Sequence, residues 1–79
     1  MREWMEKTRK DRKMTMKDTA RKLDISESYY SMIERGERQA KLDISLASKL
    51  SVAFGVSLEF IVTQESLGKT ENANKESEN

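Results

Sequence analysis

The sequence predicts an all-α domain of five short helices, and three observations favour this class. Residues of the types that cap helices precede four runs with helical apolar spacing, and these residues are Thr15, Ser26, Asp43 and Ser57. Glycine follows two of these runs, at positions 36 and 55, where helices commonly end in a left-handed residue. No segment alternates between apolar and polar residues for long enough to indicate a strand.

The first three helices are expected at about residues 2–12, 16–23 and 27–35. The first begins with the apolar pair Trp4 and Met5, and Trp4 is interpreted as a packing residue of the core or its rim. In the third, Tyr30 and Ile33 are spaced so that they share one face, which we expect to be buried.

The fourth helix is expected at about residues 44–54 and the fifth at about 58–64. The predicted apolar stripe of the fourth helix consists of Ile44, Ala47, Leu50 and Phe54. In the fifth, the apolar residues are Leu58, Ile61 and Val62. Residues 65–79 are mostly polar and cannot bury enough apolar area to offset their ordering entropy. The predicted folded domain is therefore residues 1–64, followed by a disordered tail over 65–79.

Composition excludes several classes of function. The 79 residues contain no cysteine and no histidine, so disulfides, ordinary zinc sites and histidine-based catalysis are all excluded. No apolar run approaches the roughly 20 residues that a spanning helix needs, and the charged N-terminus does not resemble a signal peptide. We therefore expect a cytoplasmic protein that is not an enzyme, needs no cofactor or metal, and does not contact membranes.

The net charge of +1 is unevenly distributed along the chain. Residues 1–41 hold twelve Lys or Arg and eight Asp or Glu, whereas residues 42–79 hold three and six. A basic N-terminal half is consistent with a polyanionic partner, although ordinary surface charge would give a similar distribution.

The most informative segment is TMKDTARKLDISESYYSMIERG, at residues 15–36. It predicts two helices of about eight residues joined by the turn Asp24-Ile25-Ser26, which is the helix-turn-helix unit. Ala20 is small enough to let the next helix cross closely, and Asp24 tolerates a left-handed turn better than most residues. Ile25 is expected to anchor the turn in the core.

The chain resembles the Cro/repressor-type helix-turn-helix domains, the Xre family of phage repressors and bacterial regulators. The resemblance runs from Met1 to about Val62 and rests on the stretches REWMEKTRKDRKMT, KLDIS, SYYSMIERGER and AFGVSLEFI. It implies a compact five-helix, repressor-like DNA-binding domain. It also implies that the third helix enters the major groove while the second lies across the phosphate backbone.

By position, the resemblance implies two sets of contacts with DNA. Candidates for base edges are Glu27, Ser28, Tyr29 and Met32. Met16 also belongs to the DNA-binding set by position, but it stands where the family usually has Gln, so the amide contacts of that Gln to phosphate and base are absent. Candidates for the phosphate backbone are Lys17, Arg35, Arg38 and Lys41. Since the exposed start of the third helix has no Arg, Asn or Gln, the strong bidentate readers are missing, and we expect modest specificity per half-site.

Further implications of the resemblance concern structure. Arg9 and Glu34 stand where family members place an ion pair between the first helix and the end of the third. Lys13 replaces a usual glycine, and the threonines at positions 8 and 19 replace apolar residues, so each buried hydroxyl would need a partner such as a carbonyl of the preceding turn. Of the adjacent tyrosines, Tyr30 is expected in the core and Tyr29 at the surface. Met5 and Met14 are interpreted as core filler.

The leading hypothesis is a transcriptional repressor that binds an inverted repeat in double-stranded DNA as a homodimer. Phe60, Ile61 and Val62 would supply the dimer surface. The basic run at residues 8–13 is a further candidate for DNA contact, or simply a solvated helix face. The alternative is a protein-interaction module of antitoxin-like or regulator-binding type, with a regulatory protein as partner and only weak DNA binding. An enzyme is disfavoured because no catalytic constellation and no Gly-rich phosphate loop is present.

Overall fold

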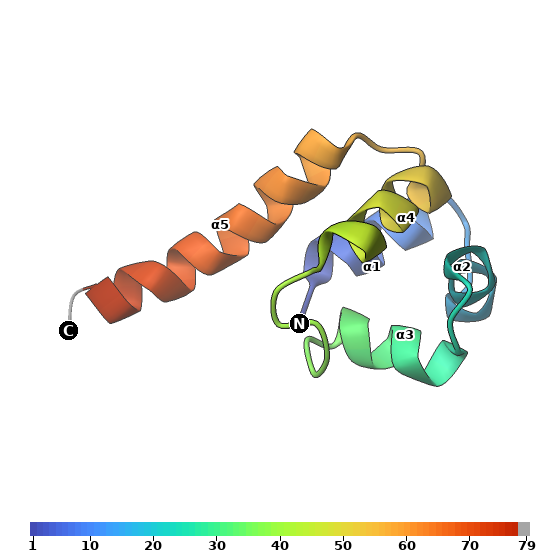
Figure 1. Cartoon of the computed structure of the whole chain (residues 1–79), viewed down its shortest axis with the longest axis horizontal. Helices are drawn as coiled ribbons and strands as arrows, with labels where there is room; N and C mark the ends of the chain where they lie inside the picture. The colour runs from blue at the N-terminus through green and yellow to red at the C-terminus, as the bar shows by residue number, and fades with distance from the viewer. Residues whose placement is uncertain (78–79) are drawn as a thin grey trace.

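The computed structural model describes the backbone of residues 1–77 and the side chains of residues 1–67. Five helices make up this part of the chain, and it contains no strand, so the all-α prediction is confirmed (Figure 1). The helices are α1 (Glu3–Asp11), α2 (Met16–Leu23), α3 (Glu27–Glu34), α4 (Ile44–Phe54) and α5 (Leu58–Ser77). The predicted bounds of α2 and α4 agree with the structure, whereas α1 is one residue shorter than predicted at each end and α3 is one residue shorter at its C-terminal end.

The four predicted N-caps are all formed by side-chain oxygens. Ser26, Asp43 and Ser57 accept hydrogen bonds from backbone N–H groups three residues ahead, at 3.0, 2.7 and 2.9 Å. Thr15 Oγ1 accepts from the N–H of Asp18 at 2.9 Å, and the Asp18 carboxylate accepts from the N–H of Thr15. This reciprocal pair is a capping box, which satisfies two backbone donors at the start of α2.

Left-handed residues end or follow several helices. Asp24, Gly36 and Gly55 have φ of 60°, 81° and 69°, as the sequence predicted. Lys13 also adopts a left-handed φ of 55°, although it lacks the freedom of the glycine that the family usually has there. Gln39 does the same, with a φ of 57°, in the loop between α3 and α4, and no residue type in that loop predicted it.

One continuous core joins all five helices. Its fully buried members include Met5, Leu23, Tyr30, Ile33, Leu50 and Ile61. The predicted stripe of α4 is wrong at its first position, because Ile44 is 83% exposed and the buried stripe consists of Leu46, Ala47, Leu50 and Phe54. Ile44 is the first residue after the N-cap Asp43, and from there its side chain faces solvent.

The buried polar groups of the core are satisfied. Thr19 Oγ1 donates to the carbonyl of Thr15 at 2.9 Å, which is the kind of partner that the sequence predicted. Among the side chains of residues 1–67, no buried nitrogen or oxygen atom lacks a hydrogen bond.

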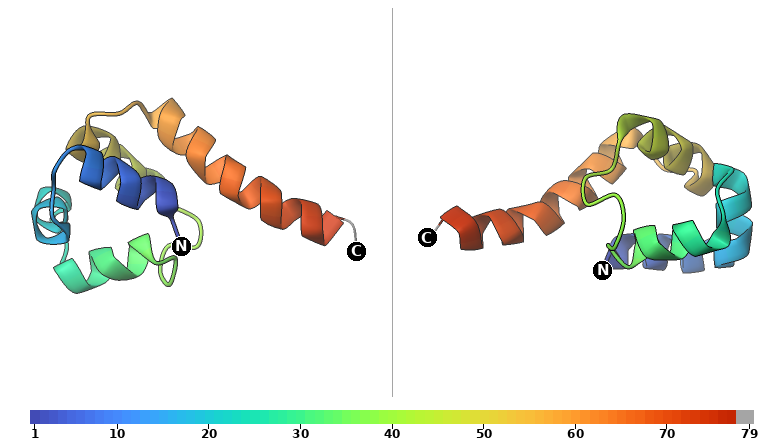
Figure 2. Two further views of the ribbon diagram at one scale, coloured as in Figure 1. Left: turned by 180° about the vertical axis from the view of Figure 1, so that it is seen from behind. Right: turned by 60° about the horizontal axis from the view of Figure 1, so that its bottom comes forward.

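The last helix is longer than predicted. α5 extends to Ser77, whereas the sequence placed its end near residue 64 and a disordered tail from residue 65. Glu65, assigned to that tail, is instead held at the domain by Arg2 and Trp4. Residues 78–79 of the predicted tail lie outside the described part of the chain. Figure 2 shows the C-terminal part of α5 running away from the other four helices. Within the described residues, no single helix is both long and apolar enough to cross a membrane.

Candidate nucleic-acid interface

The α2–α3 pair is the helix-turn-helix unit, and its turn is held by three local features. Asp24 takes the left-handed conformation, and the N–H of Ile25 donates to the carbonyl of Ala20 at 3.0 Å. The Ile25 side chain packs against the core, and Ala20 is buried between the helices. Ser26 then caps α3. The orientation of α3 is therefore fixed from its first residue.

The inward face of α3 is anchored by a buried polar network. The Glu34 carboxylate accepts from Arg9 Nε at 2.9 Å and from Arg9 Nη2 at 3.2 Å, and the Tyr30 hydroxyl donates to it at 2.6 Å. Arg9 also donates to the carbonyl of Met14, in the turn after α1. The hydrogen bond with Glu34 raises the pKa of Arg9 above its usual range, and burial together with Glu34 raises that of the Tyr30 phenol. Every charged group at this contact thus has a partner.

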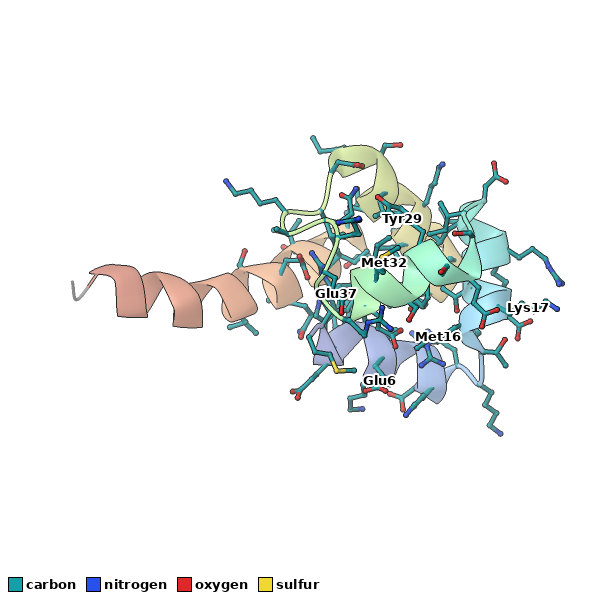
Figure 3. All side chains as sticks on the ribbon, turned by 90° about the horizontal axis from the view of Figure 1, so that it is seen from below. Glu6, Met16, Lys17, Tyr29, Met32 and Glu37 are labelled. Carbon is teal, nitrogen blue, oxygen red and sulfur yellow. The ribbon has the colours of Figure 1, made fainter. Side chains whose placement is uncertain are left out.

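The outward face of α3 lies open to solvent. Glu27, Ser28 and Arg35 are exposed, and Met32, one turn from both Ser28 and Arg35, is half-buried. Figure 3 looks onto this face and shows Met32 on α3 with Met16 and Lys17 on α2 beyond it. The candidate base-reading residues are therefore not packed inside the chain.

Tyr29 differs from its predicted exposed state. Its side chain is half-buried, and its hydroxyl accepts a hydrogen bond from Gln39 Nε2 at 2.9 Å. Gln39 Oε1 in turn accepts from the N–H of Asp43 at 3.2 Å, so a single amide links α3 to the cap of α4. The hydroxyl of Tyr29 is thereby held by Gln39 as an acceptor, while its own O–H group stays available as a donor.

Four candidate cations surround this face, but they are not equivalent. Lys17, Arg38 and Lys41 are exposed. Arg35 donates to both oxygens of Glu37, at 3.1 and 3.2 Å, and to Ser31 Oγ. Because both members of this pair are more than half exposed, it is worth at most about 1 kcal/mol, and a phosphate could replace Glu37.

The start of α2 combines a helix N-terminus with an acidic side chain. Met16 is half-buried and packs against the core, while Lys17 points outward (Figure 3). The hydrogen bond from the Thr15 backbone lowers the pKa of Asp18, which keeps its carboxylate ionised beside the helix end. A phosphate at this N-terminus would therefore meet Lys17 and, close by, one negative charge.

The cations of the basic run at residues 8–13 differ in burial, since Arg9 is buried whereas Lys10, Arg12 and Lys13 are exposed. Arg9 is buried against Glu34, so this residue is excluded as a DNA contact. Arg12 Nε donates to the carbonyl of Phe54 at the end of α4. Lys10 pairs with Glu6 at 3.3 Å on the surface of α1.

Three residues important for this region were missed by sequence reasoning. Gln39 donates a hydrogen bond to Tyr29. Arg2 and Glu65 form a largely buried ion pair at 3.0 Å, and Arg2 also donates to a backbone carbonyl of the loop after α3. An Arg just before a helix and a Glu in a polar segment both have the pattern of solvated charges. No local signal in the sequence distinguishes them from such charges.

Comparison with known proteins agrees with this geometry. A family model described as helix-turn-helix, of the Cro/C1 or Xre type, matches residues 5–61. A search of curated proteins found no match, and neither did a search of solved structures. The matched segment runs from Met5 in α1 to the buried Ile61 in α5, and so includes the helix-turn-helix unit and the Arg9–Glu34 pair that anchors it. The chain therefore belongs to the Cro/repressor-type helix-turn-helix family, a family of DNA-binding regulators.

Proposed function

We propose that this protein is a cytoplasmic, sequence-specific transcriptional repressor that binds an inverted repeat in double-stranded DNA as a homodimer. One observation carries the proposal. The outward face of α3 is open to solvent, while its inward face is locked by Tyr30, Ile33 and the Arg9–Glu34 pair. A rigid helix with a free face is what insertion into a major groove requires.

The proposed readout uses few strong contacts. Glu27 would accept from a cytosine amino group, and Met32 and the ring of Tyr29 would contact thymine methyl groups. Ser28 can bind several base edges and discriminates little. Since no bidentate reader lies at the start of α3, DNA shape and two-fold binding would supply much of the specificity.

The proposed phosphate contacts are made by cations on either side of α3. Lys17 lies at the start of α2, and Arg35, Arg38 and Lys41 follow α3. Binding should therefore weaken steeply as salt rises, by a slope of about −0.9 in log K against log salt for each phosphate neutralised.

The proposed dimer surface is on α5, with one correction to the predicted set. Ile61 is only 1% exposed and belongs to the core, so it cannot contact a second subunit. Phe60 and Val62 remain exposed, at 37% and 58%. Leu58, at 45%, is one turn before Val62 and shares its side of α5, whereas Phe60 lies on another side and packs against Trp4. The proposed surface therefore centres on Leu58 and Val62. We expect the α3 helices of such a dimer to meet half-sites roughly one helical turn apart.

Selection of bound duplexes from a random pool, followed by gel shifts at two salt concentrations, tests the proposal. R38A should weaken the selected duplex and reduce the salt slope by about 0.9, because one phosphate contact is lost. The control is K49A, which removes an exposed cation from α4. Equal affinity of the wild type for every duplex would contradict a sequence-specific regulator.

The alternative function, a protein-interaction module, is favoured by one specific observation. Glu27, Glu37 and Asp18 place negative charge near α3, and Glu37 neutralises Arg35. Charge reversal separates the two functions. R38E should abolish duplex binding with the fold intact if the protein binds DNA, whereas an interaction module would bind duplex weakly both before and after the change.

A further inference from the structure

The Arg2 guanidinium joins α5 to the segment that follows α3. Its Nε and Nη2 donate to the two carboxylate oxygens of Glu65, at 3.0 and 3.2 Å. Its Nη1 donates to the carbonyls of Ile33 at 2.7 Å and Arg38 at 3.3 Å, and Nη2 also donates to the carbonyl of Gln39. A guanidinium has five N–H groups, so these five bonds use all of its donors.

This junction is largely shielded from water. The side chains of Arg2 and Glu65 are 9% and 16% exposed. Trp4 Nε1 donates to Glu65 Oε2 at 2.8 Å, and the Trp4 ring meets the edge of Phe60 with centroids 6.1 Å apart. Removing Glu65 would therefore leave a poorly solvated Arg2 and free one side of its guanidinium.

The loop that Arg2 holds carries two of the four proposed phosphate contacts. Arg38 and Lys41 extend from it to solvent, while its backbone carbonyls at residues 38 and 39 turn inward to Arg2. Gln39, in its left-handed conformation, also binds Tyr29 on α3. Figures 1 and 2 both place the N-terminus beside this loop.

We propose that Arg2 is a positioning residue for DNA binding, which transmits the docking of α5 through Glu65 to the loop at residues 36–43. The inference rests on the proposed function, since it concerns the same interface. Arg2 itself contacts carbonyls and a carboxylate, and its donors are all occupied. It acts by fixing where Arg38 and Lys41 meet the phosphates, so the state of α5 changes DNA affinity from outside the helix-turn-helix unit.

Removal of the Glu65 charge separates this inference from simple electrostatics, because the two predict opposite changes in DNA affinity. Removing a negative charge from a DNA-binding protein should strengthen binding to a polyanion. Loss of the Arg2–Glu65 pair should instead weaken binding to DNA. The substitution E65Q therefore tests the two effects against each other, and E59Q is the matched control because Glu59 is an exposed carboxylate on the same helix.

The experiment measures the affinity of full-length wild type, E65Q, E59Q and R2K for the selected duplex. Circular dichroism fixes a temperature at which all four are folded. We expect E65Q to bind about tenfold more weakly than wild type, equivalent to about 1.4 kcal/mol, and E59Q to bind at least as tightly as wild type. R2K keeps the charge but cannot make five hydrogen bonds, and should weaken binding in the same way.

Amide hydrogen exchange gives a readout that needs no DNA. The N–H groups of Glu37 and Arg38 donate to the carbonyl of Met32, and that of Asp43 donates to Gln39. These amides should exchange faster in E65Q, while those inside α2 should not change. Unchanged loop exchange, or duplex binding by E65Q as tight as by E59Q, would overturn the positioning role alone. Absence of duplex binding by the wild type would overturn the proposed function and this inference together.

Discussion

Arg9 and Glu34 face each other between α1 and the end of α3 in a two-bond pair, with side chains 8% and 0% exposed. The pair lies on the inward side of α3, and the Tyr30 hydroxyl donates to the same carboxylate. Because the Glu34 carboxylate is fully buried, the stability of the folded domain depends on keeping both Arg9 and Tyr30 as its partners. The contact therefore fixes the angle of α3 more than it adds net free energy.

Replacement of Arg9 by methionine should be strongly destabilising. R9M preserves most of the side-chain volume but leaves a buried carboxylate without its cation, which costs about 3–5 kcal/mol. In a domain this small, that is a large part of the total free energy of unfolding. Urea unfolding followed by circular dichroism, started at low temperature, measures the change.

The control for R9M is K10M, one residue along the same helix. Lys10 pairs with Glu6, but the lysine side chain is 65% exposed, and such pairs contribute about 0–1 kcal/mol. Similar losses in the two variants would contradict a special role for the buried pair.

Stability should fall at high pH because of Tyr30. Burial, followed by the hydrogen bond to Glu34, raises the pKa of the folded phenol far above its model-peptide value of 10.0. Below pH 10 the phenol is protonated in both states, and its contribution is fully present. Above pH 10 the unfolded chain loses the proton and the folded chain keeps it, so the free energy of unfolding falls by about 1.4 kcal/mol per pH unit.

Comparison of wild type with Y30F isolates this contribution. The difference between the two free energies of unfolding should shift in favour of Y30F as pH rises from 9 to 11, since the variant has no phenol at this position. Urea unfolding at each pH provides the values. Parallel curves for the two proteins would show that Tyr30 ionises alike in both states.

The features that sequence predicted well are those that depend on neighbours in the chain. The capping box at Thr15 and the left-handed Asp24 are set by residues within one helical turn, so their patterns are visible in one short segment. Ile44 shows the limit of this reasoning. Helical spacing allowed a stripe through Ile44 or through Leu46, and only packing against α2 and α5 decides between them.

The features that sequence missed depend on contacts between distant residues. Arg2 and Glu65 are 63 positions apart, and nothing near either one distinguishes it from a solvated charge. The same holds for Tyr29. Its partner Gln39 is left-handed without being a glycine, so its residue type does not predict this conformation. The chemical types at the candidate site could therefore be predicted, but not which of them are already bound within the protein.

Replacement of Lys13 by glycine should stabilise the folded domain. Its φ of 55° costs a residue with a Cβ roughly 1–2 kcal/mol, and part of that gain is offset by the greater freedom of glycine in the unfolded chain. K13G should therefore raise the free energy of unfolding by up to about 1 kcal/mol, seen as a rise of about 4–8 °C in Tm. The matched control is K49G, inside α4, which should lose about 1 kcal/mol. Equal destabilisation by both would contradict the assigned backbone strain.

A charge on the apolar face of α5 should separate the proposed dimer. Val62 is 58% exposed on the same side of α5 as Leu58, and V62E would bury a carboxylate between two subunits joined there. Sedimentation equilibrium should give at least a tenfold weaker self-association for V62E, with circular dichroism unchanged. T63E adds the same charge at the neighbouring exposed residue, about 100° around the helix, and should associate like the wild type. A dimer unaffected by V62E would place the subunit contact elsewhere, and the spacing of the half-sites would then have to follow from that other surface.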